Sequence, residues 1–206
     1  MSTRIFLIRH GETLWNLEKR CQGFTDIPLS ETGEKQAELL SRALSRETLA
    51  AVYASDLIRA RRTAEIIARP HGLAVNTDAR LRELNQGELE GQNMEGLLAY
   101  HAELLKNWMA DPAHTRMPRG ESLLEIQGRG WAAVSEIAAR HPGAAVAVVA
   151  HNLLNVAVIS KALGLDLNHF RRLKQHASAI NEIEFGNHGT VLIRLNDLHH
   201  LDGHHD

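Results

Sequence analysis

The sequence has very little of several features that would define its structural class. Its 206 residues include one cysteine, Cys21, so neither a disulfide framework nor a cysteine-rich metal site is expected. The formal net charge is only −2, which argues against binding to nucleic acid through bulk electrostatics. Apolar runs such as 144–150 are far too short to span a membrane, and the N-terminus does not follow a signal-peptide pattern. We therefore expect a soluble, cytoplasmic protein.

The chain also has no interior linker. No Pro/Gly/Ser-rich or low-complexity stretch divides it, so we expect one domain over residues 1–206. Apolar residues make up 44% of the chain and charged residues 23%, which leaves enough apolar material for a core. Within this domain, we expect a helical insertion over 92–120 and a histidine-rich tail over 197–206.

Strand-like and helix-like segments alternate along the chain. Helical spacing of apolar residues follows Ser30, a good N-cap, and a second helix follows Ser55 or Asp56. A closing hairpin is expected from 180–186 and 190–196. This alternation predicts an α/β fold: a three-layer α/β/α sandwich around a mainly parallel sheet, with one antiparallel edge strand. The expected strands are 4–8, 49–55, 73–78, 144–152 and the hairpin, and the expected helices are 29–47, 55–72, 97–110, 121–143 and 153–164.

A histidine stands at the end of two of the expected strands. Arg9 and His10 end the first strand, and His151 ends the apolar strand 144–152. Ligands of such sheets bind beyond the carboxyl ends of the strands, so both histidines should reach one edge. One histidine at a strand end is usually a hydrogen-bonded core group. Two at matching ends, one preceded by an arginine, favour a functional site.

Six motifs together resemble the histidine phosphatase superfamily, also called phosphoglycerate-mutase-like proteins, and in particular its small phosphatases. They occur in the family's order and cover the chain from Ile5 to about Leu195. Taken alone, the opening Arg-His-Gly motif is only moderately specific, but together with the Arg-Ala-x-x-Thr-Ala block and the late histidine on an apolar strand it makes the resemblance strong. The motifs are LIRHGET with Asn16, TDIPLSETGEKQA, SDLIRARRTAE, LRELNQGELEG, PRGES and VVAHN.

The resemblance implies a phosphohistidine mechanism with His10 as the nucleophile. Arg9, Arg59 and His151 match the family's phosphate clamp, and two guanidinium groups with a histidine donor would make a metal unnecessary. Glu83 matches the acid that protonates the leaving group and then activates water. We therefore expect these five catalytic residues, no metal site and no cofactor.

The resemblance also suggests substrate-binding residues and leaves rivals open. Arg61 and Arg62 are more simply explained as a solvated helix face. Asn16 could equally be a loop or capping residue, and Arg119 a surface arginine. The predicted substrate-binding residues are Asn16, Gln22, Gly23, Asn152, Arg119 and His200. The acids that compete with Glu83 are Glu12, Glu88 and Glu90, of which Glu90 is interpreted as structural.

The expected activity is metal-independent hydrolysis of a small phosphomonoester metabolite. The alternative is a cofactor-dependent phosphoglycerate mutase, which would return the phosphoryl group to a hydroxyl instead of water. A non-catalytic phospho-ligand module and a metal-binding protein built on the C-terminal histidines are weaker readings. We expect a small phosphorylated metabolite as partner, neither nucleic acid nor membrane, and leave a homodimer open. Specificity should lie in the segment 92–117. Its candidate wall residues, Tyr100, His101, Trp108 and Met109, are equally well explained as the buried face of a helix, and the substrate itself is left open.

Overall fold

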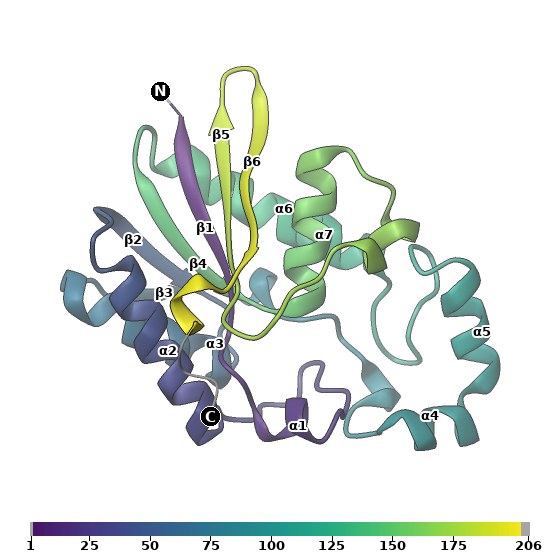
Figure 1. Ribbon diagram of the computed structural model, residues 1–206. Helices are drawn as coiled ribbons and strands as arrows, with labels where there is room; N and C mark the ends of the chain where they lie inside the picture. The colour runs from purple at the N-terminus through teal and green to yellow at the C-terminus, as the bar shows by residue number, and fades with distance from the viewer. Residues whose placement is uncertain (1, 203–206) are drawn as a thin grey trace.

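The computed structural model describes residues 2–202 of the chain. A six-stranded sheet is flanked by helices on both faces (Figure 1). The strands are β1 (Thr3–Arg9), β2 (Leu49–Ala54), β3 (Val75–Thr77), β4 (Ala145–Ala150), β5 (Ile180–Gly186) and β6 (Gly189–Asp197). The α-helices are α1 (Leu14–Leu17), α2 (Glu31–Leu44), α3 (Ile58–Ala68), α4 (Met94–Tyr100), α5 (Ala102–Ala110), α6 (Leu123–Arg140) and α7 (Asn152–Leu163).

The sheet has the order β3-β2-β4-β1-β5-β6, and the predicted fold class is confirmed. β3, β2, β4 and β1 are mutually parallel, whereas β5 runs antiparallel to β1 and to β6. The antiparallel strand therefore lies one place inside the edge, because β6 of the closing hairpin pairs along its outer side. This arrangement leaves β1 and β4 at the centre of the sheet, where both faces are covered.

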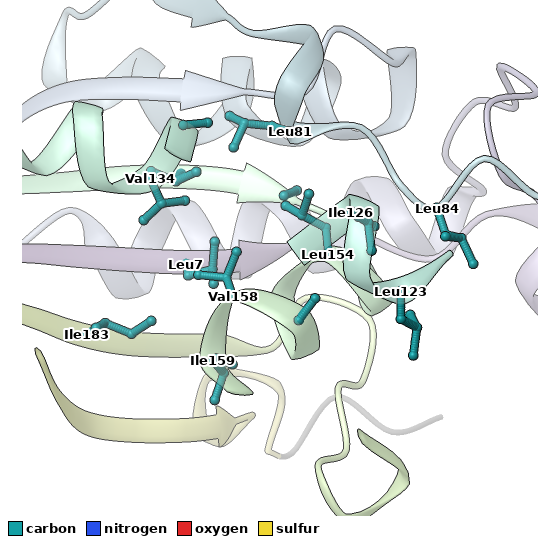
Figure 2. Close-up of a cluster of buried hydrophobic side chains, with 14 of the residues drawn as sticks. Leu7, Leu81, Leu84, Leu123, Ile126, Val134, Leu154, Val158, Ile159 and Ile183 are labelled. Atoms are coloured by element: carbon teal, nitrogen blue, oxygen red, sulfur yellow. The ribbon is translucent and has the colours of Figure 1, made fainter. Parts of the chain in front are cut away.

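Each face of the sheet carries its own apolar core. Leu7 of β1 and Val148 of β4 pack with residues of α6 and α7 on one face, several of which Figure 2 shows. The alternate residues Phe6 and Ile8 pack with α2 and α3 on the other face. The side chains of a strand alternate between its two faces, so a central strand buried on both sides reads as one apolar run. The run from Ile5 to Ile8 is the result.

Two helix starts show where the sequence pattern was sufficient and where it was not. Ser30 caps α2 as predicted, because its Oγ accepts a hydrogen bond from the backbone N of Gly33. The predicted cap of the next helix is wrong, since α3 begins only at Ile58 and its N-cap is Leu57. Its first backbone N–H instead donates to Oδ1 of Asp26, 32 residues earlier in the chain, at 2.7 Å. A long-range side chain therefore replaces the local cap.

The expected helix over 97–110 is two helices. His101, with φ −132° and ψ 27°, ends α4 and precedes α5. The break lets Leu97 of α4 be buried while Leu104 and Trp108 of α5 still contact the same core. Nothing of α5 is fully buried, however, so this segment is only lightly attached to the domain.

No helix within residues 2–202 is both long enough and apolar enough to cross a membrane.

Candidate functional site

The central strands bring the two predicted histidines together. β1 and β4 are paired in parallel, with Arg9 opposite Ala150, so the residues that follow them leave the sheet side by side. The backbone N of His10 donates to the carbonyl oxygen of Ala150 at 3.1 Å. The imidazole centroids of His10 and His151 lie 5.1 Å apart with the rings inclined at 61°. The sheet edge expected from the strand pattern is therefore the place where the site forms.

A cleft of about 150 Å³ opens at this edge. It is lined by three arginines, one of the histidines and one carboxylate from separate parts of the chain. His151 lies beneath it, fully buried against His10. The lining residues are Arg9, His10, Asn16, Arg20, Cys21, Gln22, Gly23, Arg59, Glu83, Gln86, Asn152 and Leu153.

The geometry around His10 selects one of its ring nitrogens. Nδ1 lies 2.6 Å from the carbonyl oxygen of Gly11, and a carbonyl can only accept a hydrogen bond, so Nδ1 carries the proton. In the neutral ring, Nε2 is then left with the free lone pair. Burial, together with the positive charges of Arg59 and Arg9, lowers the pKa of His10 well below 6.5. The imidazole is therefore neutral at pH 7 and able to act as a nucleophile at Nε2.

Arg59 is a fully buried cation in the wall of the cleft. Its two terminal nitrogens donate to the carbonyl oxygens of Thr25 and Gly23, at 2.9 and 2.8 Å. Its Nε, like Nε of Arg9, is buried with no hydrogen-bond partner in the structure. Burial lowers the pKa of Arg59 to about 10, so it still carries its charge at pH 7. Buried, incompletely paired guanidinium groups that face a cleft suit an anion with several acceptor oxygens.

The loop that holds Arg59 is itself held by Glu90. The Glu90 carboxylate accepts hydrogen bonds from the backbone N of Phe24 and of Thr25, both at 2.8 Å. A Cβ on Gly23 would lie 2.1 Å from Oε1 of Glu90, and its φ is +55°, so this position requires glycine. Glu90 therefore lies in the supporting structure, as interpreted from the sequence.

Glu83 is oriented by the start of α7. Its Oε1 accepts hydrogen bonds from the backbone N of Leu84, Leu153 and Leu154, at 2.9, 3.1 and 3.2 Å. The last two are N–H groups of the first helical turn, which have no partner within the helix. His151, the N-cap residue, makes no side-chain cap hydrogen bond. Glu83 thus takes the capping function and leaves the His151 ring free for the site.

Arg129 of α6 fixes the backbone that carries Glu83. Its guanidinium donates to the carbonyl oxygens of Arg80, Arg82 and Glu83, at 2.8, 2.6 and 2.7 Å. It also pairs with Glu121 at 2.8 Å. The sequence motif around Glu121 is therefore part of the support for Glu83, a role that only the long-range contact reveals.

The rivals of Glu83 and Arg59 point elsewhere. Glu12 accepts a hydrogen bond from Oγ of Ser30 at 2.9 Å, and Glu88 pairs with Arg119 at 3.1 Å. Arg61 lies 3.6 Å from Glu65, and Arg62 pairs with Glu34 at 2.8 Å, both on the exposed face of α3. Of these acids and arginines, only Glu83 and Arg59 reach the cleft.

Four of the six predicted substrate-binding residues line the cleft, namely Asn16, Gln22, Gly23 and Asn152. Asn16 also supports the start of α1, because its Oδ1 accepts a hydrogen bond from the backbone N of Thr13 at 3.0 Å. Its amide nitrogen has no such partner in the described structure and remains available to a ligand.

Arg119 and His200 are not brought to the cleft. The side chain of Arg119 is 85% exposed and turns to Glu88. His200 lines a separate cavity with Arg42 and Arg46, because the segment 199–201 contacts α2. Two further histidines of the tail, His204 and His205, lie outside the described residues. No position between 92 and 120 contributes to the lining, so the candidate wall residues of this segment lie outside it as well.

Sequence reasoning did not place Arg20, Cys21, Gln86 or Leu153 at the site, yet all four line the cleft. Arg20 stacks over the Trp15 ring at 4.3 Å and donates to the carbonyl oxygen of Gly91 at 2.7 Å. The backbone N of Gly91 in turn donates to the carbonyl oxygen of Cys21, which brings 20–23 beside 86–91. No local pattern signals this pairing, because it joins two irregular segments that are 70 residues apart.

Among the residues that the structure describes, no group of three or more His, Cys, Asp or Glu side chains is arranged to hold a metal ion. The charged groups lining the cleft are three guanidinium groups and one carboxylate, a set suited to an anionic group.

Comparisons of the sequence and the fold with known proteins give consistent results. The model of the histidine phosphatase superfamily (branch 1) matches residues 5–198. The chain is 34% identical over 204 residues to a protein of Yersinia pestis named "Probable phosphoglycerate mutase GpmB", covering 97% of this chain and 95% of that one. Among solved structures it is similar to Bacillus stearothermophilus YhfR, with TM-score 0.92 and 30% identity over 97% of this chain and 100% of that one. A mycobacterial glucosyl-3-phosphoglycerate phosphatase in complex with VO3 matches with TM-score 0.87 and 27% identity, over 95% and 99% of the two chains. Both the motifs and the full-length matches thus lead to one conclusion: this chain belongs to the histidine phosphatase superfamily.

Proposed function

We propose that the protein is a metal-independent phosphomonoesterase that hydrolyses a small phosphorylated metabolite through a phosphohistidine at Nε2 of His10. The observation that carries this proposal is the hydrogen bond from Nδ1 of His10 to the Gly11 carbonyl, which leaves Nε2 as the lone-pair nitrogen in a cleft that Arg9 and Arg59 also line. The pKa of His10, lowered well below 6.5, keeps that lone pair available at neutral pH.

The first step transfers the phosphoryl group from the substrate to His10. The Nε2 lone pair attacks phosphorus, the bond from phosphorus to the ester oxygen breaks, and that oxygen leaves with a proton. Glu83 is the carboxyl group on the cleft wall that would supply the proton. Arg9 and Arg59 would stabilise the charge on the three transferring oxygens, so the positive charge that a metal provides elsewhere comes from the chain.

The second step returns the enzyme to its starting state. A water oxygen attacks the phosphorus of phosphohistidine, Glu83 accepts a proton from that water, and the phosphorus–Nε2 bond breaks to release inorganic phosphate. His10 is then again neutral, with its proton on Nδ1. The cleft is open to solvent and no residue of α5 lines it, which favours water as the acceptor.

A mutase reaction is the second candidate, favoured by the name of the 34% identical relative. It shares the first step and differs only in the acceptor, a second hydroxyl in place of water. The solved relative with TM-score 0.87 is named a phosphatase, which supports the hydrolytic reading.

Phosphorus NMR would separate the two candidates. The protein is incubated with 3-phosphoglycerate, with and without 2,3-bisphosphoglycerate, and separately with a panel of phosphorylated amino acids, sugars and nucleosides. Each reaction is run both with and without excess chelator. We expect inorganic phosphate from at least one panel member at a rate that the chelator does not change. Formation of 2-phosphoglycerate faster than phosphate would establish the mutase instead, and loss of turnover in chelator that a divalent ion restores would contradict metal independence.

A further inference from the structure

Helix α7 carries a buried polar residue that the proposed mechanism does not use. Asn155 is 0% exposed, and both its Nδ2 and its Oδ1 lack a hydrogen-bond partner in the structure. A buried amide with no partner is costly, and in a native protein such a group calls for an explanation. Polar atoms of Arg9, Arg59 and His151 also lack a hydrogen-bond partner. In those three residues, a phosphoryl group bound in the cleft would supply the missing acceptor.

Asn155 lies one turn of α7 beyond His151. Its backbone N donates to the carbonyl oxygen of His151 at 3.0 Å, so the two residues stand in an i, i+4 relation. Both are fully buried, and both ring nitrogens of His151 are also unpartnered. Glu83 already accepts from the N–H groups of Leu153 and Leu154 between them, so those donors are not available to the ring.

The work proposed for His151 requires one particular tautomer. Burial and the charge of Arg59 lower the pKa of His151 well below 6.5, so its ring is neutral and has a single N–H. Phosphoryl oxygens only accept hydrogen bonds, so the nitrogen that faces them must carry that proton. The other nitrogen must then receive a hydrogen bond from a donor, because the partner of one ring nitrogen sets the state of the other.

We propose that Asn155 is a positioning residue whose Nδ2–H donates to Nδ1 of His151 when a phosphoryl group occupies the cleft, and so holds Nε2–H toward the phosphoryl oxygens. Nδ1 is the ring nitrogen nearer to the backbone and therefore to the helix, while Nε2 lies at the tip of the side chain. Asparagine suits this position because its amide offers a donor. Aspartate of the same shape offers only acceptors and would favour the opposite tautomer. The inference rests on the proposed function of the site.

Nitrogen NMR of the histidine rings tests this assignment directly. Protein labelled with ¹⁵N in histidine is studied with saturating vanadate, a phosphoryl mimic, and the signals missing in H151Q identify His151. We expect the Nε2–H tautomer in the wild type, the Nδ1–H tautomer in N155D, and a loss of the strong preference in N155L. S160A is the matched control, because Ser160 is another buried residue of α7 with an unpartnered Oγ but lies two turns beyond the site.

Kinetics give the second readout. We expect N155L to lower kcat/KM and to weaken vanadate binding by about tenfold, the lower end of what is typical when the partner of a functional histidine is removed. S160A should change neither, even if it lowers the melting temperature as much as N155L does. If N155D does not fold, N155L decides the question, because leucine fills the position without introducing a charge.

Two outcomes would overturn the inference. The first is an unchanged His151 tautomer in both Asn155 variants, and the second is equal kinetic losses in N155L and S160A. Failure of the proposed function is distinguishable from these, because the wild type itself would then bind no vanadate and release no phosphate.

Discussion

The cleft at the ends of β1 and β4 and the segment α4–α5 are built in opposite ways. His10, His151 and Arg59 are at most 3% exposed, and they come from β1, the end of β4 and α3, which carry the core. In α5 no residue is fully buried, and Tyr100 and Met109 of this segment are 81% and 75% exposed. The groups proposed to do the chemistry are therefore held by the same packing that holds the fold, whereas side chains of α4–α5 can vary without cost to that packing.

The comparison predicts the largest effect for the one carboxylate that the core holds in the cleft. Substitution E83Q removes the proton donor while keeping the shape of the side chain. General acid catalysis contributes about 10²–10⁴-fold, and an alkoxide needs it far more than nitrophenolate does. We expect a loss of that size with an alkyl phosphate and a much smaller one in phosphorylation by p-nitrophenyl phosphate, where a burst of nitrophenol should appear.

The matched control is E12Q. Glu12 follows His10 closely in the chain but is hydrogen-bonded to Ser30 outside the cleft, so its removal should change turnover by no more than about twofold. Equal losses on both substrates in E83Q, with no burst, would remove Glu83 from the acid role.

Burial of two neutral imidazoles predicts a smaller effect, on stability at mildly acidic pH. The folded-state pKa of His10 and of His151 lies well below 6.5, whereas an unfolded histidine titrates near 6.5. Below that pH the unfolded chain binds more protons than the folded one, so the free energy of unfolding falls as pH drops from about 6.5 toward the folded-state pKa. Each imidazole contributes at most about 1.4 kcal/mol per pH unit.

Urea denaturation between about pH 8 and 5 would measure this dependence. Variant H10Q removes one of the two groups, so its stability should fall less steeply below about pH 6.5 than that of the wild type. Parallel profiles would show that His10 is not held neutral in the folded protein.

The smallest effects are expected for exposed side chains of α4–α5. Substitutions Y100A and M109A remove side chains that are mostly in solvent, so each should change the free energy of unfolding by no more than about 0.5 kcal/mol. By contrast, I126A removes a fully buried side chain of α6 and should cost about 2–5 kcal/mol. Thermal or urea denaturation of the three variants checks both, and a large loss in Y100A or M109A would show that α4–α5 is attached more firmly than its exposure indicates.

The sequence predicted the parts of this molecule that depend on local pattern. The apolar run 5–8 and the strand 145–150 are fully buried, and such strands in a parallel sheet must end at a common edge, so His10 and His151 could be placed together. The cap of α3 could not be foreseen, because Asp26 reaches it from a distant loop. The same holds for Arg129, whose contacts with the carbonyls of 80–83 join segments nearly 50 residues apart.

The errors at the site have the same origin. Arg119 and His200 were placed near the substrate because of motif similarity, yet an ion pair with Glu88 and the position of 199–201 against α2 draw them elsewhere. Arg20 and Gln86 line the cleft because two irregular loops pair across it. Loop pairing of this kind leaves no periodic signal in either segment.

The proposed phosphohistidine at His10 is tested most directly by identifying the phosphorylated atom. The protein is mixed briefly with substrate, quenched in base and digested, and the peptide containing Ile8–Thr13 is analysed for acid-labile, base-stable phosphate. The geometry predicts phosphate on Nε2 of His10, since Nδ1 is bonded to the Gly11 carbonyl, and no label in H10A. Phosphate on a serine, on Nδ1, or still present in H10A would contradict the account.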